Sequence, residues 1–252
     1  MAYTYFISDP FRAYEEQFSD LIADFKNQGK VIYDGSRNTV KEIEFAGKKL
    51  NVKAFKVPHF INQIAYRWIR KSKAQRSFEH AGLLLQKGIG TPKPIAYVLN
   101  KQFLFLKDSY YFSEQLPYDL TYRNLIHEPD LPDHERILRE FTRFTYKMHE
   151  EEVLFKDHSP GNTLIQKTVE GYAFFLVDLN RMEFHKLSFD ERMKNFARLT
   201  PKKEMVQMMS DEYAKLSGHS YQMVFDKMWL YTTEFREKYD RKKVLKKKFL
   251  GQ

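Results

Sequence analysis

The spacing of apolar positions predicts that the chain begins with one helix, followed by a region rich in β-strands. The helix is predicted to start at Ser8-Asp9-Pro10, where a capping residue is followed by a proline in the first turn. Apolar residues then recur at helical spacing until Gly29. From residue 31 to residue 56, apolar and polar positions alternate in three runs that are separated by polar turns. This alternation is typical of antiparallel strands with one buried face.

A further hairpin and a strand extend this predicted sheet. The hairpin turns at Asn100–Lys101, the strand covers residues 110–113, and a helix is expected before them at Ser77–Leu85. Pro117 breaks the sheet pattern, and the composition turns helical after it. We therefore expect an α+β fold with an N-lobe of residues 1–115 and a mainly helical C-lobe of residues 116–252.

The stretch from Leu154 to Leu179 carries most of the candidate chemistry. Asp157 and Asn162 lie five residues apart in a loop, two apolar runs then predict a β-hairpin, and Asp178 follows its second strand. The same order occurs in the catalytic and metal loops of protein-kinase-like enzymes, which transfer phosphate from ATP. We interpret Asp157 as the catalytic base and Asn162 and Asp178 as Mg²⁺ ligands. The alternative is an Asx-turn, a capping amide and a strand-end acid.

A lysine on the third strand is the candidate for holding the ATP phosphates. Kinases use a V-A-I-K strand in which the small residue and the lysine face the nucleotide. In K-A-F-K, residues 53–56, Ala54 and Lys56 share a face, so Lys56 is the first candidate and Lys53 the weaker one. Glu79, in the helix that follows, is the expected carboxylate partner of Lys56. A solvated strand lysine is the alternative for either position.

Two segments of the N-lobe are expected to contact the rest of the nucleotide. The turn between the first two strands contains Gly35 and Asn38, in the place where kinases fold a glycine-rich loop over the phosphates. This turn has a single glycine, so an ordinary hairpin is the alternative. The end of the sheet, from Glu114 to Leu116, corresponds to the hinge whose backbone would bind adenine.

Charge and composition limit the classes of function. The net charge is +9, but the segment from Arg236 to Lys248 alone has eight basic and two acidic residues, a net charge of +6. This concentration suggests a basic tail on a near-neutral enzyme more than a nucleic-acid-binding body. Such a tail would bind an anionic membrane surface, and a solvated C-terminal helix is the equal alternative. A second basic run covers Val57–Lys73. The absence of cysteine excludes disulfides and thiolate metal sites, and no apolar run is long enough to span a bilayer.

With these residues in place, the chain resembles the Kdo/heptose lipopolysaccharide kinase family of Gram-negative bacteria over roughly residues 29–185. The most specific pieces are R-S-F-E-H-A (76–81), G-I-G-T-P-K-P-I-A (88–96), K-D-H-S-P-G-N-T-L (156–164) and V-D-L-N-R (177–181). The resemblance implies a protein-kinase-like bilobal fold and an enzyme that uses Mg²⁺ and ATP. It also implies an acceptor hydroxyl on Kdo or heptose of the lipopolysaccharide inner core, at the cytoplasmic face of the inner membrane.

The chain departs from the kinase pattern at two places. Phe155 stands where the catalytic-loop histidine is expected, so the backbone of this loop needs another support, and Asp178 is followed by Leu-Asn in place of Phe-Gly. Of the two nearby histidines, we expect His149 to be structural and hydrogen-bonded, whereas His158 is either structural or an acceptor contact.

Two alternatives remain beside the lipopolysaccharide kinase. One is a soluble small-molecule kinase of the aminosugar or antibiotic type. The sequence has no A-P-E motif and no long activation segment, with which protein kinases hold a protein substrate, and this absence also fits a small acceptor. The other is a catalytically dead, kinase-like binding module, against which the complete set of Asp157, Asn162 and Asp178 argues. The expected partner is a lipid-linked or free sugar. Neither a nucleic acid nor a protein partner is inferred.

Overall fold

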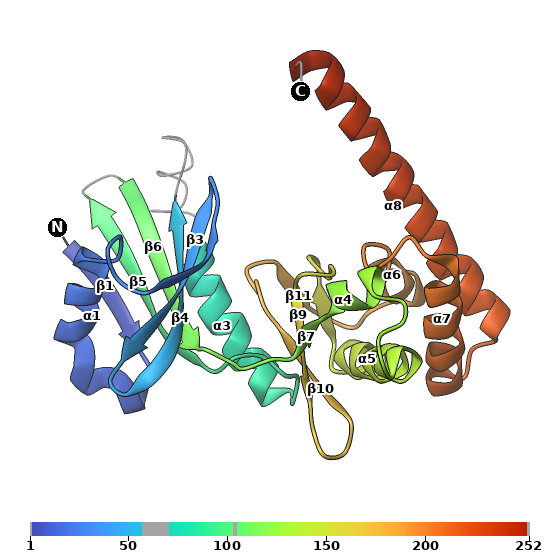
Figure 1. Ribbon diagram of the computed structural model, residues 1–252, viewed down its shortest axis with the longest axis horizontal. Coiled ribbons are helices and arrows are strands. Elements are labelled where there is room, and N and C mark those ends of the chain that lie inside the picture. Colours follow the sequence, from blue (N-terminus) through green and yellow to red (C-terminus); the bar gives the residue numbers. More distant parts are fainter. Residues whose placement is uncertain (1, 57–70, 103–104, 251–252) are drawn as a thin grey trace. The chain divides into compact units, whose positions relative to one another are not determined.

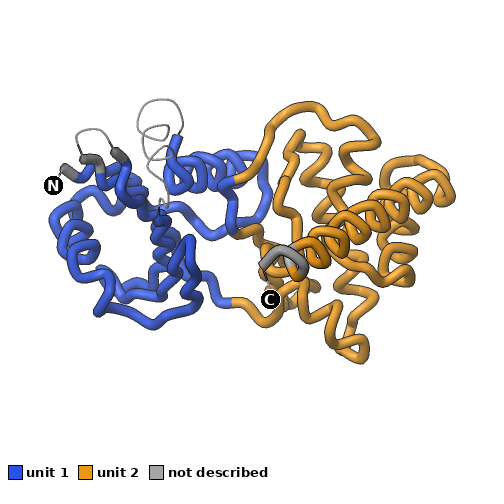
Figure 2. Tube along the Cα trace, turned by 90° about the horizontal axis from the view of Figure 1, so that it is seen from above, with its two compact units in different colours: residues 1–117, 178–180 blue, residues 118–177, 181–252 orange. Residues whose placement is uncertain are grey.

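The computed structural model describes residues 2–56, 71–102 and 105–250. Most of the basic run expected at Val57–Lys73 lies outside the described residues. The chain forms two compact units, one of residues 1–117 with 178–180 and the other of residues 118–177 with 181–252 (Figure 2). The first unit thus ends two residues after the expected lobe boundary, and a three-residue segment that begins with Asp178 returns to it.

The first unit is built on a six-stranded antiparallel sheet with the strand order β1-β5-β6-β4-β3-β2 (Figure 1). The strands are β1 (Ala2–Ile7), β2 (Lys30–Asp34), β3 (Asn38–Phe45), β4 (Lys48–Lys56), β5 (Pro94–Gln102) and β6 (Phe105–Glu114). The predicted strands between 31 and 56 are present, whereas β1 was not predicted. β1 pairs with β5 along its whole length, from Ala2 opposite Lys101 to Ile7 opposite Ala96, so a distant segment of the sequence determines it.

Helices cover both faces of this sheet. The predicted first helix is a 3₁₀ turn, η1 (Asp9–Tyr14), continued by α1 (Glu15–Ala23), and its buried Phe18 packs with Val52 and Ala54 of β4. On the opposite face, α3 (Lys73–Gln86) packs its Ala74 against Phe55 of β4. Successive residues of β4 therefore alternate between the α1 face and the α3 face, as the pleat of a strand requires.

The second unit is mainly helical. Its helices are α4 (Tyr122–His127), α5 (His134–Glu150), α6 (Phe189–Asn195), α7 (Lys203–Ser217) and α8 (Tyr221–Leu250). Short strands connect them: β7 (Leu120–Thr121), β8 (Val153–Phe155), β9 (Thr163–Lys167), β10 (Tyr172–Leu176) and β11 (Met182–Phe184). β9 and β10 form the predicted hairpin. No helix in the described part of the chain is long and apolar enough to cross a membrane.

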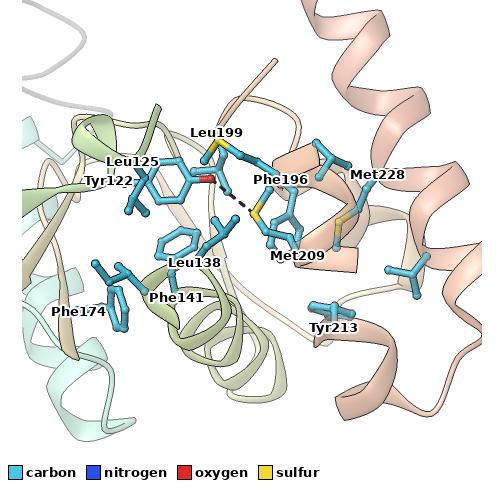
Figure 3. Close-up of a cluster of buried hydrophobic side chains, with 14 of the residues drawn as sticks. Tyr122, Leu125, Leu138, Phe141, Phe174, Phe196, Leu199, Met209, Tyr213 and Met228 are labelled. Carbon is cyan, nitrogen blue, oxygen red and sulfur yellow. Dashed lines mark hydrogen bonds between the residues drawn. The ribbon is translucent and has the colours of Figure 1, made fainter. Parts of the chain in front are cut away.

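Aromatic and methionine side chains fill the core of this unit (Figure 3). Phe141 of α5 lies against Tyr122 and Phe174, with ring centroids 4.5 and 5.8 Å apart. The buried hydroxyl of Tyr122 donates to the sulfur of Met209 at 3.6 Å, so this polar atom is not left unsatisfied. The core fixes α5 against the hairpin, and the loop that carries Asp157 connects these two elements.

Candidate active site

Asp178 lies in the first unit in a strained conformation. Its backbone φ is +62°, in the left-handed region that side-chain-bearing residues rarely adopt. Its carboxylate oxygen Oδ1 accepts from Lys53 Nζ at 2.5 Å and from Asn180 Nδ2 at 2.8 Å. Its side chain is 35% exposed. A held, partly exposed carboxylate of this kind is suited to binding a cation.

Lys53, and not Lys56, is the lysine beside Asp178. The Lys53 side chain is only 12% exposed, and its Nζ lies over the ring of Phe55 at 5.2 Å. Lys56 is exposed at the end of β4. The sequence favoured Lys56 because it shares a strand face with the small residue Ala54. In this fold, however, that face is the buried α1 side of the sheet, so the geometry favours Lys53.

Further cations surround the Lys53–Asp178 pair. The pKa of Lys73 is lowered, first by burial and then by the positive charge of Arg37, with smaller contributions from Lys53 and Arg76. In addition, Nε of Arg76 is buried and donates to no atom of the described residues. The positive charges of Arg37, Lys53 and Arg76 near Lys73 create a local potential that attracts phosphate oxygens.

Glu79 does not pair with either strand lysine in this structure. Its carboxylate accepts from Lys71 Nζ at 2.8 Å and from Gln75 Nε2 at 3.0 Å, both near the start of α3. The residue after it in α3, His80, contacts the backbone oxygen of Leu179 through Nδ1 at 2.6 Å. Sequence reasoning missed His80, although it stands inside the R-S-F-E-H-A motif.

The expected nucleotide loop is a tight turn between β2 and β3. The N–H of Gly35 donates to the carbonyl of Asn38 at 3.0 Å, and the carbonyl of Arg37 accepts from the N–H of Lys56 at 3.1 Å. The turn thereby places Arg37 next to the end of β4. Arg37, which lies between Gly35 and Asn38, is the member of this turn that contributes to the cationic cluster.

The expected hinge is held to the sheet by backbone bonds. The N–H of Glu114 donates to Lys93 at 3.0 Å, and the N–H of Gln115 donates to Lys49 at 2.9 Å. The carbonyl of Leu116 accepts from the Gln115 side chain at 3.3 Å. Glu114 and Leu116 therefore stand at the end of β6 and just beyond it, close to the boundary of the first unit.

Asp157 lies in the second unit, between two arginines. Its Oδ1 accepts from Nη1 of Arg181 and from Nη1 of Arg198, each at 2.9 Å. Its other oxygen, Oδ2, has no hydrogen-bond partner among the described residues, and the side chain is 17% exposed. One carboxylate oxygen is thus fixed while the other remains available to accept a proton.

Asn162 is built into the same loop. Its Nδ2 donates to the carbonyl of Asp157 at 2.8 Å, so the donor end of the amide is used by the loop. The acceptor end, Oδ1, is the end that a hard cation requires. The carbonyl of Asn162 also accepts from the N–H of Val177 at 3.0 Å. This bond ties the loop to the residue that immediately precedes Asp178 in the chain.

The loop receives its backbone support from α5 and α6. Asn195 donates from Nδ2 to the carbonyl of Phe155 at 2.8 Å, and its Oδ1 lies 3.2 Å from Nε2 of His149. His149 is buried and also contacts the hydroxyl of Tyr213 at 3.0 Å, which confirms its structural role. Phe155, which replaces the catalytic-loop histidine, has no side-chain group to bond the loop backbone. Asn195 supplies a hydrogen bond to that backbone instead.

His158 is a core residue and not an acceptor contact. Its side chain is 1% exposed and stacks on Phe141, with ring centroids 5.4 Å apart. Burial lowers its pKa to about 3, so the ring is neutral at physiological pH. Its Nδ1 is buried without a partner among the described residues.

The residues fit a nucleotide and a divalent cation. In the first unit, Asp178 offers a carboxylate oxygen, and the cations around Lys53 are suited to phosphates. In the second unit, Asn162 offers an amide oxygen. Carboxylate and amide oxygens are ligands that Mg²⁺ prefers. Among the described residues, no group of three or more His, Asp or Glu side chains could hold a metal by itself. This is in keeping with Mg²⁺, which in phosphate-transfer sites is bound by one or two carboxylates together with substrate phosphates.

Comparison with known proteins identifies a family and solved structures with a similar fold. A search of curated proteins by sequence finds no significant match. A solved structure titled "WaaP in complex with acyl carrier protein" superposes with a TM-score of 0.65 at 14% identity, covering 94% of this chain and 98% of that one. The model of the lipopolysaccharide kinase (Kdo/WaaP) family matches residues 26–219. With most of its length matched, this chain belongs to the lipopolysaccharide kinase (Kdo/WaaP) family.

Proposed function

We propose that the chain transfers the γ-phosphoryl group of ATP, with Mg²⁺, to a hydroxyl of Kdo or heptose in the lipopolysaccharide inner core. The observation that supports it most is the Lys53–Asp178 pair at 2.5 Å, held within a cluster of cations. A strand lysine beside the acid that ends the hairpin is the arrangement that phosphoryl transfer uses to place phosphates and metal. Family membership supports a kinase acting on lipopolysaccharide.

Each residue has a separate role in this proposal. Lys53, aided by Arg37 and Lys73, binds phosphate oxygens, and Asp178 with Asn162 would hold the metal. When bound, Mg·ATP supplies the phosphoryl group and neutralises the charge that develops on it. Asp157 takes the proton of the acceptor hydroxyl on Oδ2 as the new O–P bond forms and the bond to ADP breaks. This revises the expected phosphate lysine from Lys56 to Lys53.

The test replaces Asp157 and follows phosphate transfer. Asp157→Asn keeps the size of the side chain but removes the base, so kcat should fall by about 10² to 10⁴-fold. The affinity for ATP should stay within about twofold. Asp130→Asn, at an exposed position of the same unit, is the matched control. Transfer by Asp157→Asn at the wild-type rate would remove Asp157 from the mechanism.

The acceptor is identified by a panel with radiolabelled ATP. Lipid A carrying Kdo, a heptosylated core, aminoglycosides and a generic protein separate the lipopolysaccharide kinase from a soluble small-molecule kinase. If only the aminoglycosides are labelled, the soluble small-molecule kinase is favoured. If no acceptor is labelled and the protein does not bind ATP, the catalytically dead binding module is favoured.

We further propose that the enzyme works at the cytoplasmic face of the inner membrane. The support is the basic end of α8, Arg236–Lys248, whose described side chains are exposed. This end of the helix follows Phe235 and projects beyond the rest of its unit (Figure 1). An acyl carrier protein, the partner named for the WaaP structure, is a second candidate for the same surface. No protein partner was expected from the sequence. Adding carrier protein to the vesicle experiment described below separates the two.

A further inference from the structure

A pocket of about 450 Å³ lies in the second unit, one side chain away from Asp157. Its walls come from β8, β11, α6 and one face of α8. On α8 the lining residues are Tyr231, Glu234, Phe235 and Lys238, whose spacing places them on the same side of the helix. Arg181 and Arg198 line the pocket and also bind Asp157 Oδ1. The pocket and the proposed base therefore share two arginines.

The pocket has more positive charge than its own carboxylates balance. It is lined by five Lys or Arg and three Glu residues. Lys156 pairs with Glu183, and Lys238 pairs with Glu234 at 3.6 Å. Glu191 is bonded to His185 at 3.0 Å, outside the lining.

Three cations of the lining are left after these pairings. Arg181 and Arg198 share the single carboxylate of Asp157, and Lys194 forms no ion pair within the described residues. Two guanidinium groups on one carboxylate, together with an unpaired ammonium, leave a net positive potential that an anionic ligand would neutralise.

Aromatic rings stand beside these cations. The guanidinium of Arg198 lies 5.5 Å from the Phe235 ring centroid, and Nζ of Lys194 lies 5.9 Å from that of Tyr231. The rings keep the two cations in place. They also offer flat apolar surface, against which the C–H groups of a sugar ring pack. Cations and ring faces in one pocket together fit an acidic sugar.

We propose that this pocket binds the anionic group of the acceptor, a sugar carboxylate or phosphate, and so positions its hydroxyl for Asp157. The proposal rests on the proposed function, and it names the acceptor class as an acidic sugar. Arg198 and Lys194 are the residues that would bind the anion. A neutral sugar of the same size lacks the charge-assisted bonds and should bind more weakly.

The experiment measures binding of three probes by titration calorimetry, without ATP. The probes are free Kdo, which carries one carboxylate, a neutral heptose, and inorganic phosphate. Wild-type protein should bind Kdo at least tenfold more tightly than the heptose. Lys194→Gln should weaken Kdo binding by roughly tenfold, the effect of losing one charge-assisted bond. Lys215→Gln is the matched control, because Lys215 pairs with Asp211 on α7 and does not line the pocket.

Arg198→Gln should weaken Kdo binding as well, but it also removes a bond to Asp157. Lys194→Gln therefore carries the test if Arg198→Gln does not fold. Phosphate binding that is weakened by Lys194→Gln, in the absence of Kdo binding, would support an anion site that takes a phosphate group. Equal binding of Kdo and heptose, an unchanged affinity in Lys194→Gln, or no binding of any probe would overturn the proposal.

A separate readout distinguishes this inference from the function on which it rests. In transfer assays, Lys194→Gln should raise the KM for the acceptor and leave the KM for ATP unchanged. If the protein binds Kdo through Lys194 but neither binds nor cleaves ATP, the pocket assignment stands and the kinase mechanism is wrong. If Lys194→Gln phosphorylates an acidic acceptor with the same KM as wild type, the kinase mechanism stands and the pocket assignment is wrong.

Discussion

Asp178 combines a strained backbone with a paired side chain. A φ of +62° is costly for a residue other than glycine, and bonds from Lys53 and Asn180 to its carboxylate help to hold it there. Such strain is typical of functional sites, where the position of the side chain matters more than its stability. The pairing also explains why Lys53 is the strand residue to test first.

Lys53→Met should weaken ATP binding by about 10 to 100-fold, since it removes charge-assisted bonds to phosphate and to Asp178. Lys56→Met is the matched control on the same strand and should change affinity by less than twofold, because Lys56 is exposed at the end of β4. Calorimetry with Mg·ATP measures both. A larger loss in Lys56→Met would return the assignment to the lysine that the sequence favoured.

His158 makes the stability of the protein sensitive to acid. Burial lowers its pKa to about 3 in the folded state, against about 6.5 in the unfolded chain. Its contribution to stability is therefore complete above about pH 6.5 and is lost as the pH falls toward 3, since the unfolded state binds the proton more tightly. Between pH 7 and pH 5 one such group costs about 2 kcal/mol.

His158→Phe should reduce this loss, because the ring that replaces the imidazole does not titrate and can stack on Phe141. Denaturant unfolding at pH 7 and pH 5 gives the difference directly. His127→Phe, at an exposed position of the same unit, is the control and should leave the pH dependence unchanged. An equal fall in stability for wild type and His158→Phe would show that other groups cause the acid sensitivity.

At the scale of elements, α6 supports the loop that carries Asp157. Asn195, at the end of α6, connects the carbonyl of Phe155 with the buried His149 of α5. Arg198, just beyond α6, donates to the carbonyl of Lys156 at 3.0 Å. Two residues that follow the loop in sequence, one at the end of α6 and one just beyond it, thus fix its backbone in the absence of the usual histidine.

Asn195→Ala should therefore lower both stability and turnover. Leaving the carbonyl of Phe155 and the imidazole of His149 without this partner costs about 1–3 kcal/mol. The displaced Asp157 should lower kcat more than it changes the KM for ATP. Asn124→Ala, which removes a capping side chain of α4, is a control for loss of stability alone. If both variants lose stability and neither loses kcat, α6 does not position the base.

At the scale of the whole molecule, the positive charge gathers at one end of the chain. The stretch from Arg241 to Gln252 has six Lys or Arg and no acidic residue, and its described side chains are exposed on α8. Near an anionic membrane each such cation contributes about 1 kcal/mol, an effect that salt weakens. The pocket-lining residues of α8 all lie before this stretch.

A chain that ends at Asp240 should thus lose membrane binding and keep its kinase site. Co-sedimentation with anionic vesicles at low salt should fall at least tenfold relative to the full chain, and neutral vesicles should bind neither. Acceptor phosphorylation in detergent should be unchanged. Undiminished binding of the shortened chain to anionic vesicles would exclude this end of α8 as the anchor.

Much of this molecule follows from local patterns in the sequence. The alternation in β3 and β4, the helical spacing in α1 and the β9–β10 hairpin depend on residues close together in the chain, so periodicity predicts them. The spacing of Asp157, Asn162 and Asp178 predicted a catalytic loop in the same way, and that assignment stays a prediction. The family resemblance rested on these same short stretches, and the family match confirms it.

Only the tertiary structure decided the points that depend on distant contacts. Alternation along β4 separates Lys53 from Lys56 but does not say which face packs against α1, and that packing placed Lys53 beside Asp178. β1 forms by pairing with the distant strand β5. Glu79 pairs with Lys71 and not with a lysine of β4. The pocket beside Asp157 is lined by β8, β11, α6 and α8, which are up to about eighty residues apart in the chain. Its lining residues meet only when the chain has folded, so no local sequence pattern marks them.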